Sequence, residues 1–106
     1  MDIRYNIGDS RFVKPCEDAI RANRNRLDAG DTVEISLTGE KPGYAERIEV
    51  EIRDNDTATF GTDWTSSDVS RFPARIKAAA TALLNCGCFG CFVIEHRDGL
   101  LTIRIA

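Results

Sequence analysis

Apolar residues recur at helical spacing in two stretches of the chain. In the first stretch, Val13, Cys16, Ile20, Asn23 and Leu27 follow one another at intervals of three and four, which predicts a helix over residues 15–29. Pro15 suits the first turn of this helix, because its missing N–H would have no partner there. The same spacing later in the chain predicts a helix that begins near residues 69–72, includes Pro73 in its first turn and ends at Asn85. The pattern therefore predicts two amphipathic helices.

Six other stretches alternate apolar and polar residues, which is typical of strands with one buried face. They are residues 2–7, 32–37, 47–53, 57–64, 91–96 and 100–105. The last two are separated by Arg97-Asp98-Gly99, and an Asp-Gly pair is a strong signal for a tight hairpin turn. We expect these two strands to form a β-hairpin.

The resulting order of elements, β-α-β-β-β-α-β-β, predicts an α+β fold. Since consecutive strands are usually neighbours, we expect a mainly antiparallel sheet of about five or six strands with two helices packed on one face. A chain of 106 residues fits one domain, covering residues 1–106. The opposite face of the sheet would then carry the carboxylates of Glu34, Glu49 and Glu51.

The composition narrows the class of protein without identifying a function. Hydrophobic residues make up 42% of the chain and charged residues 29%, which is typical of a folded, soluble protein. The formal net charge of −3 is unevenly distributed, because the predicted helices are basic and the middle strands are acidic. A polyanion would therefore meet the helices and a cationic partner the sheet. No apolar run resembles a signal peptide or a membrane span, so we expect a cytoplasmic protein.

Three of the four cysteines lie in the turn after the second predicted helix. Cys86, Cys88 and Cys91 are spaced so that two or three thiolates can bind Zn²⁺, with His96 as a further candidate ligand. Strand alternation opposes such a site, because it places His96 on the buried side of its strand and Cys91 on the other side. A redox pair and small thiols packed at a crowded turn are the alternatives. We favour packing and expect no cofactor, with zinc as the alternative.

Basic residues gather on the two predicted helices, several of them near the start of the second. They are Arg21, Arg24, Arg71, Arg75 and Lys77. Helix starts favour anions, so these side chains are candidates for binding the phosphates of a nucleic acid. The element order α-β-β-β-α from Pro15 to Leu84 resembles that of double-stranded-RNA-binding domains, whose second helix also has basic residues near its start. This resemblance implies a nucleic-acid ligand, although the acidic strands and Pro73 depart from the family pattern.

The chain shows no pattern typical of catalysis. His96 is the single histidine, no serine lies in a nucleophile elbow, and no glycine loop has phosphate-binding spacing. We therefore expect a non-enzymatic binding module that contacts a macromolecular partner, with a protein as the favoured partner. The candidate contacts are Glu34, Glu49, Glu51 and Trp64.

Three alternative functions remain open, along with one form of self-association. The alternatives are a nucleic-acid binder, a zinc or thiol protein, and an inhibitor that places an acidic sheet face against a nucleic-acid enzyme. The predicted sheet would also have unpaired edge strands, and such an edge can pair with a second copy of the chain. A homodimer through a sheet edge is therefore a further expectation.

Overall fold

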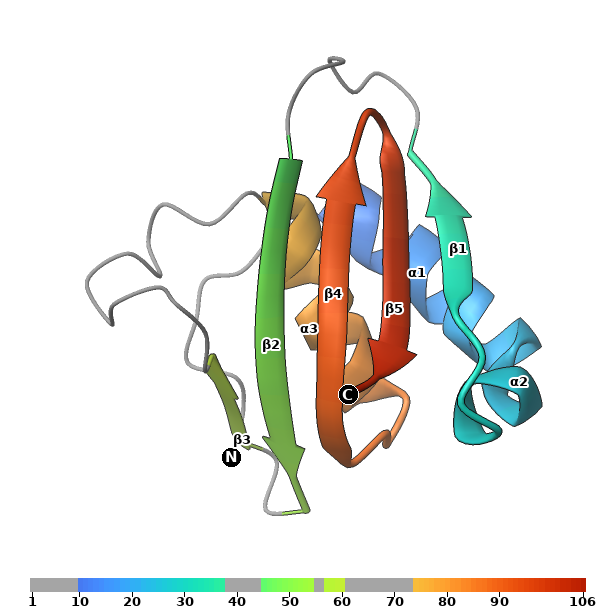
Figure 1. The fold of residues 1–106 in the computed structure, drawn as a ribbon, viewed down its shortest axis with the longest axis vertical. Helices are drawn as coiled ribbons and strands as arrows, with labels where there is room; N and C mark the ends of the chain where they lie inside the picture. The colour runs from blue at the N-terminus through green and yellow to red at the C-terminus, as the bar shows by residue number, and fades with distance from the viewer. Residues whose placement is uncertain (1–9, 38–44, 55–56, 61–73) are drawn as a thin grey trace.

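The computed structural model describes residues 10–37, 45–54, 57–60 and 74–106. In chain order the elements are α1 (Ser10–Ala22), α2 (Arg24–Asp28), β1 (Val33–Ser36), β2 (Ala45–Arg53), β3 (Thr57–Phe60), α3 (Ala74–Asn85), β4 (Gly90–Arg97) and β5 (Leu100–Ile105). Figure 1 shows the helices behind the sheet, as one layer on one of its faces. The α+β class and the antiparallel sheet predicted from the sequence are confirmed.

The sheet has the strand order β1-β5-β4-β2-β3, and all neighbouring strands are antiparallel. The predicted hairpin is confirmed, because β4 and β5 pair around Asp98 and Gly99, whose φ angles are 52° and 82°. The hairpin lies between β1 and β2, so the expectation that consecutive strands are neighbours is wrong there (Figure 1). The physical reason is that β4 and β5 are rich in large apolar residues, which bury more surface at the centre of a sheet.

The core lies between the sheet and the helix layer. One cross-strand row shows how it is built, since none of its four side chains is more than 1% exposed. The row consists of Val33, Ile103, Ile94 and Ile48, on β1, β5, β4 and β2. Buried side chains of the helices pack against this side of the sheet, among them Ile20 of α1 and Leu83 of α3. The helices therefore cover the apolar face of the sheet.

The first helical region departs from the prediction. Instead of one helix over residues 15–29, α1 begins at Ser10, before Pro15, and a second helix, α2, follows it. The break is at Asn23, where φ is −117° and ψ is 20°. The Asn23 side-chain amide donates a hydrogen bond to the Ala19 carbonyl at 2.8 Å, and such a local bond competes with regular helix. The predicted order of elements is therefore not matched.

The second predicted helix corresponds to α3. It ends at Asn85, as predicted, and Gly87 follows with a left-handed φ of 71°. Its predicted start near residues 69–72 lies outside the described residues. The same holds for the strand expected at residues 2–7 and for the second half of the strand expected at residues 57–64.

Candidate functional site

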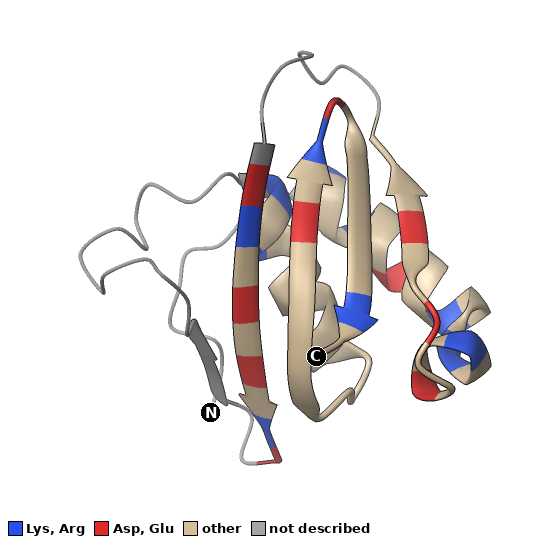
Figure 2. Cartoon of the chain, in the orientation of Figure 1, with Lys and Arg blue, Asp and Glu red and all other residues tan. Residues whose placement is uncertain are grey.

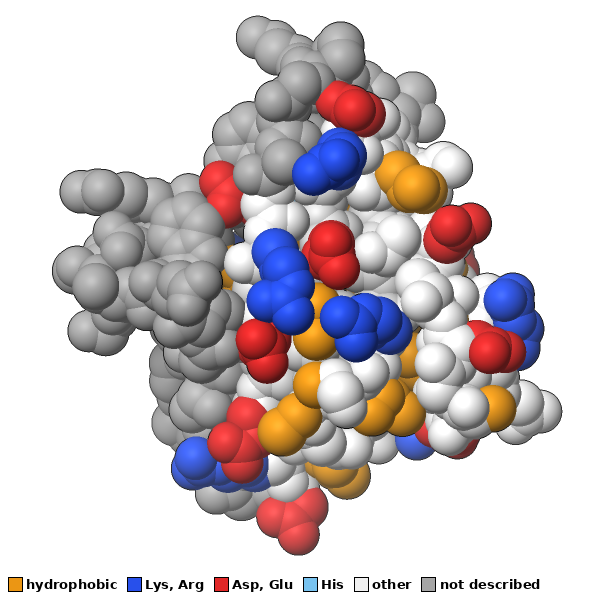
Figure 3. Space-filling view, in the orientation of Figure 1, with side chains coloured by type: hydrophobic (Ala, Val, Ile, Leu, Met, Phe, Trp, Pro, Cys, Tyr) orange, Lys and Arg blue, Asp and Glu red, His pale blue; other side chains and the backbone are white. Residues whose placement is uncertain are grey.

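One face of the sheet has no described helix over it (Figure 1). We call it the outer sheet face, and Figure 3 views the molecule from this side. It is formed by the outward side chains of four strands. These are Glu34 and Ser36 on β1; Arg47, Glu49, Glu51 and Arg53 on β2; Cys91, Val93, Glu95 and Arg97 on β4; and Leu100, Thr102 and Arg104 on β5.

The outer sheet face carries four acidic and four basic side chains, so its charge is mixed (Figure 2). Glu34, Glu49 and Glu51 are exposed on this face, and arginines accompany them there. On β2, Arg47 Nη1 lies 3.3 Å from Glu49 Oε2, and a second pair, Arg53 with Glu51, has the same length of 3.3 Å. The acidic-inhibitor interpretation stays a prediction, and the three carboxylates that motivated it lie among basic side chains.

Two cross-strand rows run through the centre of this face. The first row consists of Glu49, Val93 and Arg104, which are direct neighbours on β2, β4 and β5. The second row consists of Arg47, Glu95, Thr102 and Glu34, on β2, β4, β5 and β1. Each row therefore places an acidic and a basic side chain within one or two strands of each other.

Half of the charges on the outer sheet face have no ionic partner among the described residues. The two pairs on β2 account for the other half. The side chains without an ion pair or a side-chain hydrogen bond to a described residue are Glu34, Glu95, Arg97 and Arg104. Exposed charges of this kind contribute little to the stability of a fold. These side chains present both signs of charge on the outer sheet face.

Val93 is buried although it lies on the outer sheet face. Its side chain is 2% exposed, and Figure 3 shows apolar side chains at the centre of this face between long basic ones. Leu100, on the neighbouring strand, is 38% exposed, and Phe89 and Ile105, near the ends of β4 and β5, are 50% and 39% exposed. Sequence alternation assigned Val93 to this face but gave no sign of its burial, because neighbouring strands supply the surrounding side chains.

The cysteines of the turn after α3 do not converge on one point. Cys88 is buried, Cys86 is partly buried, and Cys91 is exposed on the outer sheet face. Burial raises the pKa of the Cys86 and Cys88 thiols, which disfavours the thiolate that would bind a metal. Nowhere in the described residues do three or more His, Cys, Asp or Glu side chains come together as a metal site requires. The predicted separation of His96 from Cys91 is confirmed, since His96 is 1% exposed.

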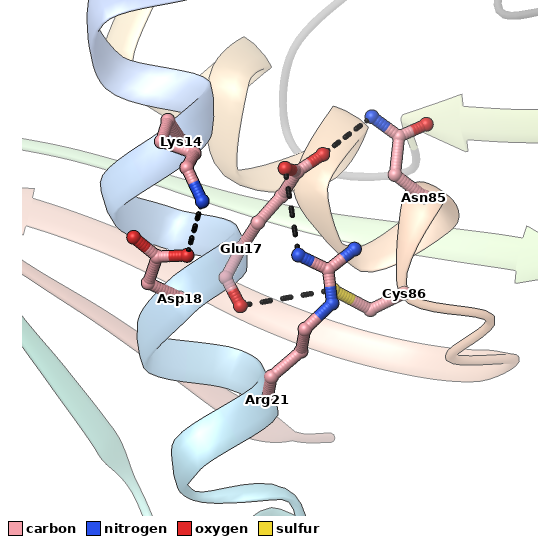
Figure 4. A network of polar contacts seen from close by, with 6 residues as sticks. All are labelled: Lys14, Glu17, Asp18, Arg21, Asn85 and Cys86. Carbon is pink, nitrogen blue, oxygen red and sulfur yellow. Dashed lines mark hydrogen bonds and ion pairs between the residues drawn. The ribbon is translucent and has the colours of Figure 1, made fainter.

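A polar network joins α1 to the end of α3 (Figure 4). At its centre is Glu17, whose carboxylate accepts a hydrogen bond from the Asn85 side-chain amide at 2.8 Å. The same carboxylate lies 3.7 Å from the Arg21 guanidinium. The Cys86 thiol donates a hydrogen bond to the Glu17 backbone carbonyl at 3.8 Å. The contacts of Glu17 with Asn85 and Cys86 join α1 to the end of α3, so they hold these two parts of the helix layer together.

Arg24, a predicted phosphate contact, is used by the fold itself. Its Nη1 donates a hydrogen bond to the Cys86 carbonyl at 3.0 Å, and its Nη2 donates a longer one to the Gly87 carbonyl at 3.5 Å. Its Nε lies 3.4 Å from Asp28. The last carbonyls of a helix lack partners within the helix, and Arg24 supplies donors beside the end of α3. Together with Arg21, it therefore stabilises this end of the helix layer.

The starts of α1 and α3 lie at the opposite end of the helix layer (Figure 1). There the ring of Phe12 has the Arg75 guanidinium 5.1 Å and the Arg11 guanidinium 5.6 Å from its centroid, within the range of cation–π contacts. Sequence reasoning identified Arg75 but missed Arg11, because no local pattern shows that the two helices start side by side. Two predicted contacts lie outside the described residues, Arg71 and Trp64.

The predicted phosphate-binding set is therefore divided between two ends of the helix layer. Arg21 and Arg24 lie at one end, and Arg75 and Lys77 lie on the first turn of α3 at the other. The β4–β5 hairpin also separates β1 from β2, so residues 15–84 do not form a sheet of their own. The resemblance to double-stranded-RNA-binding domains therefore does not extend to the arrangement of the strands.

The fold and these surfaces define a two-layer α+β protein with an open sheet face. Comparison of the chain with protein-family models, curated proteins and solved structures gives no match. In the part of the chain that the structure describes, no helix is long and apolar enough to cross a membrane. The function must therefore be inferred from the outer sheet face and from the helix starts.

Proposed function

We propose that this protein is a non-enzymatic binding module whose outer sheet face contacts a partner protein. The observation that carries the proposal is the set of charges of both signs on that face without an ionic partner in the described chain. Complementary charges give protein interfaces specificity and speed their formation. Leu100, which is 38% exposed, adds apolar surface to the face. A shallow hollow beside it is lined by Glu95, Arg97, Asp98, Leu100 and Thr102.

The helix layer supports this choice by contrast. Some of its polar side chains bridge separate elements, as Glu17 does with Asn85 at 2.8 Å and Arg24 with the Cys86 carbonyl at 3.0 Å, while others, such as Lys14 and Asp18, pair within one helix. The bridging contacts are needed by the fold. The four sheet charges without an ion pair to a described residue make no comparable bridging contact within the described chain, and exposed charges of this kind suit recognition.

A matched pair of charge reversals tests the proposal. Glu49 and Asp18 are both exposed acids paired with a base on their own element, with Arg47 at 3.3 Å and Lys14 at 2.8 Å. A tagged chain is used to capture proteins from its own cells, as wild type, as Glu49→Lys and as Asp18→Lys. We expect Glu49→Lys to lose a partner by about tenfold, while Asp18→Lys retains it. A partner captured equally by both variants, or no partner with the wild type, contradicts the proposal.

A second candidate function is phosphate binding at the helix starts. It is favoured by the position of Arg11 and Arg75 beside Phe12, at the end of the helix layer where α1 and α3 begin. Helix starts attract anions through their unpaired N–H groups and the helix dipole. A nucleic-acid backbone is the corresponding macromolecular ligand.

Retention on heparin and on double-stranded RNA tests this second function. We expect retention at low salt that falls steeply at moderate salt and is weakened by Arg75→Glu. Arg26→Glu is the control. Arg26 pairs with Asp31 at 3.6 Å and lies on α2, at the end of the helix layer opposite the starts of α1 and α3. No retention at low salt, or equal retention of both variants, contradicts it.

A further inference from the structure

We propose that the partner of the outer sheet face is a second copy of this chain. The two copies bind face to face across a two-fold axis that runs along β4. This inference rests on the proposed function, because it uses the same face and names its partner.

The row of Glu49, Val93 and Arg104 is the basis of the proposal. Val93 lies on β4, the carboxylate lies one strand away on β2, and the guanidinium lies one strand away on β5. Neighbouring strands are about 4.8 Å apart, so the two charges lie at similar distances on opposite sides of β4. A two-fold axis along β4 exchanges these sides. It places Glu49 of each copy opposite Arg104 of the other, with the axis passing over the two buried Val93 side chains.

The neighbouring row fits the same axis. Glu95 lies on β4, so its carboxylate faces the same group of the second copy. Its cross-strand neighbour is Arg47 on β2, so the two carboxylates would lie between two guanidinium groups. The axis also places Arg97 of one copy opposite Arg97 of the other, because this residue too lies on β4. It lies beside the hairpin turn, where the twist of the two sheets would move these like charges apart.

This symmetry favours a second copy over an unrelated protein. An interface between two identical chains related by a two-fold axis must be self-complementary. If one residue of the first copy contacts a second residue of the other copy, the same two residues are also in contact with the copies exchanged. The arrangement acid, apolar, base across β2, β4 and β5 meets this requirement. Arg104 also has no ion pair with any described residue of its own chain. An unrelated partner would not require opposite charges at matching positions on β2 and β5.

The size of the face predicts a weak dimer. Four neighbouring strands that are about 4.8 Å apart and about 20 Å long present roughly a few hundred Å² of surface. This is less than the about 800 Å² per partner of standard interfaces. We therefore expect dimers that form at high protein concentration and dissociate on dilution.

Sedimentation equilibrium of complementary variants tests the proposal. We expect the wild type to dimerise, and Glu49→Arg and Arg104→Glu each to weaken the dimer about tenfold or more, because each variant faces like charges across the axis. An equimolar mixture of the two variants should regain the dimer, since every Arg then meets a Glu. A wild type that stays monomeric at about 1 mM, or a mixture that does not exceed its components, overturns the proposal.

Cross-linking through Cys91 gives an independent readout. This thiol is exposed and lies on β4, one register step from Val93 on the same face, so the axis brings two copies of it together. A short bis-maleimide should link two wild-type chains and two Cys86→Ser chains, but not two Cys91→Ser chains. Linkage that survives Cys91→Ser, or no linkage at concentrations where dimers sediment, contradicts this axis.

The failures of the two proposals are distinguishable. If the mixture of Glu49→Arg and Arg104→Glu stays monomeric but Glu49→Lys still loses a captured protein, the outer sheet face binds a different partner. The proposed function then stands and the dimer falls. If the capture is also unchanged, both proposals fall.

Discussion

The helix layer and the outer sheet face are both rich in charge and both contain ion pairs within one element, but some charged side chains of the helix layer also join separate elements. In the helix layer, Glu17 bonds to Asn85, which lies 68 residues further along the chain. On the outer sheet face, Arg47 pairs with Glu49, only two residues away on the same strand. Contacts between distant segments fix how elements pack, whereas pairs along one strand fix nothing beyond it. The bridging contacts of Glu17 are therefore needed by the fold, whereas the exposed ion pairs on β2 contribute little to its stability.

The largest expected effect separates the two faces of one strand. Ile94 and Val93 are adjacent on β4 and almost completely buried, at 0% and 2% exposure, but face opposite sides. We expect Ile94→Ala to lower the free energy of unfolding by about 3 kcal/mol, because it opens a cavity under the helices. Val93→Ala should lower it by about 1 kcal/mol, since exposed side chains around it can relax. Urea denaturation measures both, and equal losses would show that the outer sheet face is packed like the core.

The next effect compares two carboxylates. Glu17→Ala should lower the free energy of unfolding by about 1–2 kcal/mol, because it removes the hydrogen bond from Asn85 and the contact with Arg21. Glu49→Ala should change it by less than about 0.5 kcal/mol, because its pair with Arg47 is exposed. Urea denaturation of the two variants measures both changes in the free energy of unfolding. A larger loss for Glu49→Ala would reverse the assignment of roles.

The pH dependence of stability tests the burial of the Cys16 thiol on α1. Burial, with a smaller contribution from Glu17, raises the pKa of the Cys16 thiol from 9.0 to about 12. The unfolded chain then loses this proton at a lower pH than the folded chain, so stability is complete below about pH 9 and falls as pH rises towards 12. The slope from this thiol is at most about 1.4 kcal/mol per pH unit. Unfolding of Cys16→Ala between about pH 8 and pH 10.5 should show a shallower decline, and an unchanged slope would contradict it.

The smallest effect is one of accessibility. Cys91 lies on the outer sheet face and is exposed, while Cys16 and Cys88 are buried. A thiol reagent should therefore modify Cys91 rapidly and the two buried thiols at the rate of opening of the fold. Cys91→Ser should remove the fast phase and change stability by less than about 0.5 kcal/mol. Rapid modification of Cys88 in the folded Cys91→Ser protein would contradict its burial.

Features that depend on neighbours in the chain could be predicted from the sequence. The hairpin around Asp98 and Gly99 and the end of α3 at Asn85 were predicted because turn and cap residues act locally. The inward position of His96 and the outward position of Cys91 followed from alternation along one strand.

Features that depend on distant segments could not be predicted. Nothing in the local pattern shows that the β4–β5 hairpin separates β1 from β2, and the rows on the outer sheet face follow from that order. Three further features also depend on segments that are far apart in the sequence. They are the positions of Glu49 and Arg104 on either side of β4, the burial of Val93, and the hydrogen bonds from Arg24 to backbone carbonyls. The break in the helix at Asn23 has a local cause. Asparagine occurs both within helices and at their ends, however, so its presence alone did not predict the break.

The most specific claim is that two copies of this chain bind each other through the outer sheet face rather than through the helix layer. NMR spectra of the amide groups, recorded as the protein concentration rises from about 50 μM to about 1 mM, test it most directly. We expect concentration-dependent shifts at Glu49, Val93 and Arg104, with those of Asp18 and Arg21 on α1 unchanged. Shifts confined to α1 and α3, or none at any residue, would contradict the claim.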